Sequence, residues 1–68
     1  MKVSLKALRA NANLTQKAAA KQIGVAQKTI QNWEYERSFP DVPTLLKICE
    51  IYNCTFDDIY IPDKLAKS

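Results

Sequence analysis

Four hydrogen-bonding side chains in the middle of the chain could contact a ligand together: Gln27, Lys28, Gln31 and Asn32. Helical spacing puts them largely on one side of a helix, away from the apolar Ile30. A glutamine or asparagine amide can pair with adenine through two hydrogen bonds, and a lysine can donate to O6 and N7 of guanine. The row therefore indicates the chemistry that reads base edges in a DNA major groove. The alternative is a solvated polar helix face, which needs no ligand.

The segment 15–33 supplies the elements that would position this row: a helix, a sharp turn and a second helix. Gly24 is the only glycine of the chain, and it stands where the first helix must stop. Ala20 leaves room for the two helices to cross closely, and Val25 and Ile30 are spaced to fold the second helix back onto the first. This pattern is typical of a helix-turn-helix that reads DNA.

Charge is divided unevenly along the chain. Residues 1–33 carry six basic side chains and no acidic one, whereas residues 34–68 carry four basic and seven acidic side chains, which together give the net charge of +3. A strongly cationic half favours contact with a polyanion such as DNA, with the anionic half left free. The alternative is the uneven charge that many small domains carry without any such ligand.

Other classes of chemistry find little support. The chain has no histidine, no clustered carboxylates in its cationic half and no glycine-rich phosphate loop, so we expect neither an enzyme nor a cofactor nor a small-molecule ligand. Cys49 and Cys54 are too few to hold zinc and are poorly spaced for a disulfide, so we expect two small core residues and no metal. No window approaches the about 18 apolar residues of a membrane span, and residues 1–4 do not begin a signal peptide. We therefore expect a cytoplasmic protein that does not bind membranes.

The apolar spacing predicts an all-α fold of five helices, over about residues 4–12, 16–23, 27–35 and 42–52 and a short one after Thr55. Thr15 and Asp41 are expected N-caps, Asn53 is expected to close the fourth helix, and Thr55 and Asp58 match a capping box. The inward-facing residues are expected to include Leu5, Leu8, Ala12, Trp33, Leu45, Ile48, Cys49, Tyr52, Phe56 and Ile59. Residues 1–62 would form one compact bundle, and residues 63–68 a flexible tail.

A wider set of residues carries a family resemblance: Leu8-Arg9, Leu14-Thr15-Gln16, Ala20, Ile23-Gly24-Val25, Thr29-Ile30, Trp33-Glu34, Pro40 and Leu45-Leu46-Lys47-Ile48. In these residues the chain resembles the Xre family, which includes the phage repressors and Cro. The resemblance spans about residues 5–60 and holds over five elements. It implies a lambda-repressor-like domain that binds duplex DNA in sequence-specific fashion as a transcriptional regulator. It further implies a repressor of phage, prophage or mobile-element type, which would be bacterial or phage-encoded and nucleoid-associated when bound.

The resemblance also implies roles for individual residues. Base contacts would come from Ala26, Gln27, Lys28, Gln31 and Asn32, and phosphate contacts from Gln16, Lys17, Thr29, Arg37 and Ser38. Arg9 and Glu34 would form an ion pair that ties the first helix to the end of the third, with Gly24 and Ala20 as structural residues of the turn. Two exposed charges of little energetic consequence are the alternative for Arg9 and Glu34.

Three positions depart from the family pattern. Ala26 stands where relatives often have a capping serine or threonine, so the third helix is expected to lack an N-cap side chain. Tyr35-Glu36 replaces a common Asn-Gly, so a non-glycine must adopt the following turn, and Glu36 brings a negative charge near the expected phosphate path. Ala19 replaces a larger residue, which predicts slightly thin packing.

The expected partner is a double-stranded DNA operator. A weak homodimer, formed in solution or only on DNA, is a further expectation, because the core need not absorb all of the apolar residues near the C-terminal end: Ile51, Phe56, Tyr60 and Ile61. The alternative is a monomer in which these side chains complete the core or remain as scattered apolar residues on the surface. A different function also remains open, in which the same domain is an antitoxin or a protein-interaction adaptor that uses its acidic half.

Overall fold

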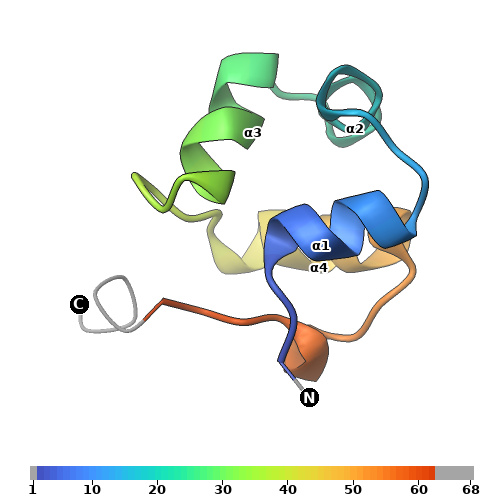
Figure 1. Ribbon diagram of the computed structural model, residues 1–68, viewed down its shortest axis with the longest axis vertical. Coiled ribbons are helices and arrows are strands. Elements are labelled where there is room, and N and C mark those ends of the chain that lie inside the picture. The colour runs from blue at the N-terminus through green and yellow to red at the C-terminus, as the bar shows by residue number, and fades with distance from the viewer. Residues whose placement is uncertain (1, 63–68) are drawn as a thin grey trace.

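Helices form the secondary structure of residues 2–62, which are the residues that the computed structural model describes (Figure 1). They are α1 (Leu5–Asn11), α2 (Gln16–Ile23), α3 (Gln27–Glu34), α4 (Val42–Tyr52) and the 3-10 helix η1 (Phe56–Asp58). In Figure 1, α2 and α3 lie together on the side of the molecule opposite η1, with α1 and α4 between them. The predicted all-helical fold is confirmed for these residues, and the predicted tail 63–68 lies outside them.

Within residues 2–62, the expected five-helix bundle is corrected to four α-helices and one 3-10 turn. The chain leaves η1 at once because Ile59 is extended, with φ −86° and ψ 126°. Its neighbours pair with the N-terminal segment: the Val3 amide donates to the Asp58 carbonyl at 2.7 Å, and the Tyr60 amide donates to the Val3 carbonyl at 2.9 Å. This parallel bridge satisfies backbone groups that a longer helix would need for itself.

Side chains at the predicted positions cap the helices. Thr15 accepts the Ala18 amide at 3.0 Å, and Asp41 accepts the Thr44 amide at 3.0 Å, as predicted. Asn53 closes α4 in the left-handed conformation with φ 56°. The predicted bounds of α2 and α4 are confirmed, whereas α1 and α3 are shorter by one or two residues because Ser4, Ala12 and Tyr35 are caps and not helical residues.

The core lies between the four α-helices and includes Ile59, which follows η1. Ile30, Ile48 and Ile59 are its largest fully buried side chains, and the remaining buried apolar residues are Leu5, Leu8, Ala19, Ala20, Ile23, Trp33, Leu45, Cys49 and Tyr52. Ala12 and Cys54 are only partly buried, and both cysteines are free thiols. Phe56 was expected to point inward and does not: it is 39% exposed, since the 3-10 turn gives the buried position to Ile59.

No helix within residues 2–62 is long and apolar enough to cross a membrane. Within the same residues, no group of three or more histidine, cysteine, aspartate and glutamate side chains is arranged to hold a metal ion.

Candidate nucleic-acid interface

The turn between α2 and α3 sets the position of α3. Gly24 ends α2 with φ 92°, and its amide and that of Val25 both donate to the Ala20 carbonyl, at 2.8 and 3.0 Å. A Cβ at Gly24 would meet nothing closer than the Lys47 ammonium at 3.7 Å, so the positive φ and not lack of space favours glycine here. Ala20 is buried beneath the turn, which allows the close crossing of α2 and α3 that its small size predicts.

One face of α3 is anchored and the other is open. Ile30 and Trp33 are buried in the core. Ala26, Gln27 and Lys28, at the start of α3, are exposed, and Gln31 and Asn32 on the next turn are half-buried. The residues predicted to contact bases therefore lie on the N-terminal half and the outer side of a helix that is fixed through its inner side.

The residues predicted to contact phosphates fall into two groups, one on α2 and α3 and the other in the loop that follows α3. Gln16 and Lys17 begin α2, where Gln16 is half-buried and Lys17 exposed, and Thr29 lies half-buried on α3. Arg37 and Ser38 are exposed in the loop that follows α3.

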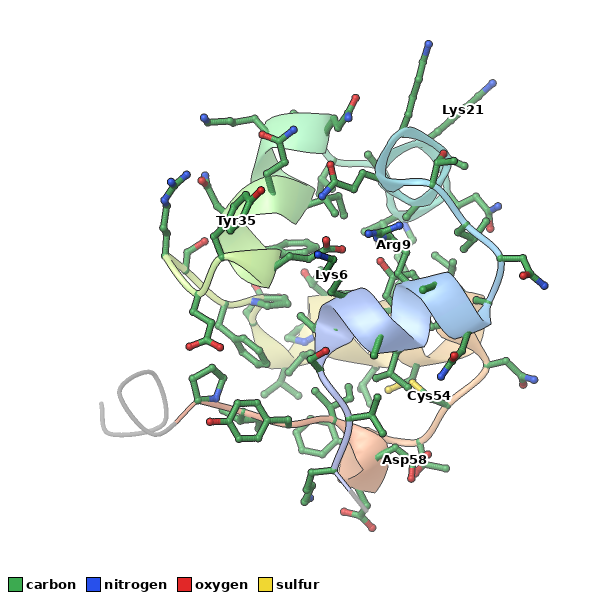
Figure 2. The ribbon with its side chains drawn as sticks, viewed as in Figure 1. Lys6, Arg9, Lys21, Tyr35, Cys54 and Asp58 are labelled. Atoms are coloured by element: carbon green, nitrogen blue, oxygen red, sulfur yellow. The ribbon has the colours of Figure 1, made fainter. Side chains whose placement is uncertain are left out.

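The loop after α3 is held against the end of that helix. The amides of Arg37 and Ser38 donate to the Asn32 carbonyl at 2.9 and 3.4 Å. The turn needs a residue with positive φ, and because no glycine is present, Glu36 adopts it with φ 61°. The Arg37 guanidinium lies over the Tyr35 ring, 5.2 Å from its centroid. Figure 2 shows Tyr35 beside the C-terminal end of α3, on the same outer side as this loop. The sequence reasoning missed the Tyr35–Arg37 contact.

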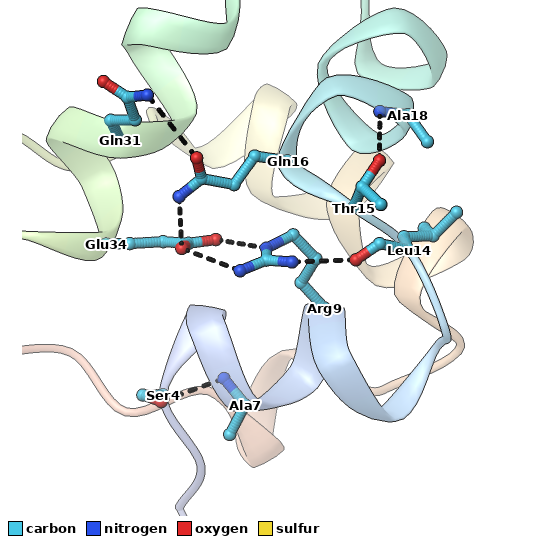
Figure 3. A network of polar contacts seen from close by, with 9 residues as sticks. All are labelled: Ser4, Ala7, Arg9, Leu14, Thr15, Gln16, Ala18, Gln31 and Glu34. Atoms are coloured by element: carbon cyan, nitrogen blue, oxygen red, sulfur yellow. Dashed lines mark hydrogen bonds and ion pairs between the residues drawn. The ribbon is translucent and has the colours of Figure 1, made fainter.

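A network of polar side chains lies between α1, α2 and α3 (Figure 3). Arg9 donates to both oxygens of Glu34, from Nε at 2.6 Å and from Nη2 at 3.1 Å, and also donates from Nη1 to the Leu14 carbonyl at 2.8 Å. The Glu34 side chain is only 4% exposed and that of Arg9 12%. The hydrogen bond with Glu34 raises the pKa of Arg9 above its usual value, so the guanidinium stays charged. The ion pair expected from the family resemblance is thus present and largely buried.

The same network contains two links that the sequence reasoning missed. The Gln16 amide nitrogen donates to Glu34 Oε1 at 3.0 Å, and the Gln31 amide nitrogen donates to the Gln16 oxygen at 3.5 Å. Gln16 and Gln31 had been predicted as separate contacts to phosphate and base. Sequence spacing does not predict a hydrogen bond between amides on different helices. The only feature of the sequence that pointed to these two bonds was the predicted proximity of α2 to α3.

Exposed cationic side chains lie on both helices of the helix-turn-helix. They are Lys17 and Lys21 on α2 and Lys28 on α3. Figure 2 shows Lys21 and Asp58 at opposite ends of the molecule. Glu34 is neutralised by Arg9, but Glu36 is exposed and keeps a negative charge next to Arg37. Exposed lysines on the same two helices as exposed amide side chains suit contact with a polyanion.

Comparison with known proteins shows which family the sequence matches. A helix-turn-helix family model matches residues 5–59. The HTH-type transcriptional regulator ImmR of Bacillus subtilis is 35% identical over 63 residues, which cover 93% of this chain and 50% of ImmR. An uncharacterized HTH-type transcriptional regulator of Archaeoglobus fulgidus is 34% identical over 64 residues, covering 94% of this chain and 90% of that protein. The HTH-type transcriptional activator BcrR of Enterococcus faecalis is 31% identical over 61 residues, covering 90% of this chain and 30% of BcrR. The chain thus spans half the length of ImmR and less of BcrR.

Proposed function

The chain belongs to the Xre/Cro-like helix-turn-helix family of DNA-binding transcriptional regulators, and from this membership we propose that it represses transcription by placing α3 in the major groove of an operator. One observation carries the proposal: the inner side of α3 is fixed by Ile30 and Trp33, while its outer side is open and bears amides and a lysine. A rigid helix with hydrogen-bonding groups on its free side suits base recognition. The action proposed is binding and not catalysis.

Base recognition is assigned to the open side of α3. Gln27 and Lys28, both exposed, would reach base edges first, and Asn32 and Gln31 would follow one turn later. Ala26 is exposed at the start of the helix, where its methyl group could contact a thymine methyl. These contacts would supply the specificity.

Phosphate binding is assigned to the two groups of residues described above, one on α2 and α3 and one in the loop after α3. Gln16, Lys17 and Thr29 would hold one side of the groove, helped by the free amides at the start of α2. Arg37 and Ser38 would hold the backbone on the other side. The contact with the Tyr35 ring restricts the Arg37 side chain, which lowers the entropy lost when it binds a phosphate.

Repression would follow from occupancy of the operator by the protein. A protein bound across a promoter excludes other proteins from the same groove and needs no activity of its own. The resemblance to phage repressors favours a phage, prophage or mobile-element regulator that acts on the nucleoid in the bacterial cytoplasm. The similarity to BcrR, named an activator, makes activation the competing outcome of a reporter assay with the selected operator.

Selection of bound sites from random duplex DNA, followed by affinity measurements over a salt series, tests the proposal. We expect one enriched sequence and an affinity that falls steeply as salt increases, because cationic side chains release counterions from the phosphates. A protein that binds no duplex even at low salt would contradict the proposal. That result would favour an adaptor or antitoxin, in which the acidic C-terminal half contacts another protein.

We also propose that two copies bind one operator. Leu46 of α4 is 53% exposed and Tyr60 is 45% exposed, and Phe56 adds a third exposed apolar side chain, whereas Ile51 and Ile61 are half-buried against the core. A weak two-fold contact through α4 and η1 would cover these groups and set two α3 helices about 34 Å apart on a near-palindromic site. Sedimentation of the protein with its selected site checks this. One protein per site, with no symmetry in the selected sequences, would rule the dimer out.

A further inference from the structure

We propose that Gln31 presents its side-chain oxygen to DNA as a fixed acceptor, so that it selects a base with an exocyclic amino group, adenine or cytosine. The orientation would be set by Glu34 through Gln16. This inference rests on the proposed function, because it names the base chemistry that one residue of α3 reads.

The carboxylate of Glu34 fixes the orientation of the Gln16 amide, which in turn fixes that of Gln31. A carboxylate accepts hydrogen bonds and cannot donate them. Its Oε2 accepts from Arg9 Nε, and its Oε1 accepts from both Arg9 Nη2 and Gln16 Nε2. The bond to Gln16 is 3.0 Å long, and the Glu34 side chain is almost fully shielded from water. Gln16 must therefore turn its amide nitrogen toward Glu34, since its oxygen would meet a second acceptor in that place.

The orientation of Gln16 determines that of Gln31. With its nitrogen at Glu34, Gln16 turns its oxygen toward α3, where Gln31 Nε2 approaches to 3.5 Å. This distance is at the outer limit of a hydrogen bond, so the link is weak, but only the nitrogen of Gln31 can donate to it. Figure 3 shows the Gln31 oxygen on the far side of its amide from Gln16.

A fixed amide reads bases differently from a free one. A free glutamine can exchange its oxygen and nitrogen by rotation, and so can offer either an acceptor or a donor. A held Gln31 offers its oxygen, which matches N6 of adenine or N4 of cytosine in the major groove and meets an unfavourable acceptor on guanine O6 or thymine O4. Gln27 is exposed, and its side chain has no such hydrogen bond within residues 2–62.

The first test needs no DNA. Side-chain amide resonances of the full chain, labelled with nitrogen-15, would be compared between the wild type and Gln16→Met, which keeps the length of the side chain but removes its amide. We expect the Gln31 amide resonances to shift and those of Gln27 to stay. Gln22→Met is the matched control, because Gln22 is an exposed glutamine on the same helix. A Gln31 amide that is unchanged in Gln16→Met would overturn the chain of orientations.

The second test measures base preference. The position read by Gln31 is the one at which Gln31→Met loses preference on the selected site. There we expect the wild type to prefer adenine or cytosine over guanine and thymine by on the order of tenfold. Gln16→Met should lose most of this preference while keeping the preference at the position read by Gln27, and the double variant should lose no more than Gln31→Met. Gln22→Met should behave as the wild type.

Two results of this second test would overturn the inference: a preference for guanine or thymine at that position, or a Gln16→Met variant that binds all sequences more weakly but with unchanged preference. The latter would leave Gln16 as a phosphate contact only. A chain that binds no DNA at all would reject the proposed function and the base preference together, while the amide resonances would still decide whether Gln16 orients Gln31.

Discussion

Arg9 and Glu34, 25 positions apart in the sequence, are joined by two hydrogen bonds between the guanidinium and both carboxylate oxygens. The pair ties α1 to the last residue of α3, and a third bond from Arg9 to the Leu14 carbonyl adds the segment that leads into α2. Three helices therefore depend on one largely shielded ion pair. The same carboxylate also holds Gln16, so this anchor lies directly under the proposed DNA-binding surface.

Removal of one partner of this pair should destabilise the fold strongly. Arg9→Met would leave the shielded carboxylate of Glu34 without its cation, and Glu34→Met would do the reverse, each at a cost of about 3 kcal/mol or more. The double variant should lose less than the sum of the two, because it leaves no unpaired charge. Urea denaturation of the four proteins measures the coupling. Losses that simply add would mean that the pair contributes little to stability.

Much of this fold was predictable because the relevant signals are local. The caps Thr15 and Asp41, the left-handed Gly24 and the apolar spacing of α4 each act within a few residues, and each is confirmed. The fifth predicted helix is present only as the 3-10 turn η1, because a non-local pairing limits its length. Val3 forms a parallel bridge with Ile59 directly after η1, and nothing in the local sequence around Phe56 indicates that contact.

The candidate site divides in the same way. The outward row Gln27, Lys28 and Gln31 follows from helical periodicity, although its contacts with DNA stay a prediction. The amide links of Gln16 depend on how α2 crosses α3, and no pattern in one sequence carries that information. The Tyr35–Arg37 contact depends on the positive φ of Glu36. The absence of glycine predicted that a non-glycine residue would adopt this turn, but it did not indicate which side chains the turn would bring together.

A serine at position 26 should stabilise the protein. Ala26 occupies the N-cap of α3 with extended backbone, and no side chain there accepts the free amides of the first turn. Ala26→Ser supplies that oxygen, so we expect the free energy of unfolding to rise by about 1 kcal/mol. Ala26→Val, which adds bulk without an acceptor, is the control. Equal stability of the serine and valine variants in urea denaturation would argue against a missing cap.

A glycine at position 36 should relieve backbone strain. Glu36 has φ 61°, which costs an ordinary residue on the order of 1 kcal/mol relative to glycine. Glu36→Gly should therefore raise the stability by roughly that amount and also strengthen DNA binding, because it removes a negative charge beside Arg37. Glu36→Gln separates the two effects, since it removes the charge and keeps the strain. If Glu36→Gln stabilises as much as Glu36→Gly, charge and not backbone conformation is the cause.

Alkaline pH should destabilise the wild type more than a Tyr52→Phe variant. Burial, with a smaller contribution from the charge of Glu34, raises the pKa of Tyr52 to about 12 from its usual 10. Above pH 10 the unfolded chain loses the phenolic proton while the folded chain keeps it, so stability falls as the pH rises from 10 to 12. Burial also raises the pKa of Cys54, to about 11, and this effect is common to both proteins. Denaturation curves at pH 9, 10 and 11 should therefore diverge between them, and parallel curves would refute the assignment.

Substitutions on the outer side of α3 should reduce the sequence specificity of DNA binding, whereas substitution of Lys6, a cation on α1, should leave that specificity unchanged. Gln27 and Asn32 bear amides on the open side of the helix, and neither side chain is needed by the core. Gln27→Ala or Asn32→Ala should cost about 1–3 kcal/mol on the selected site and relax the preference at one base pair, because each removes a pair of hydrogen bonds to a base edge. Lys6→Ala, on α1, should leave the sequence preference unchanged and affect only the salt dependence. Binding of each variant to the selected site and to random duplex, measured over a salt series, checks this. If Gln27→Ala and Asn32→Ala weaken both duplexes equally, these amides contact the backbone or solvent, and base reading must be assigned to other residues of α3.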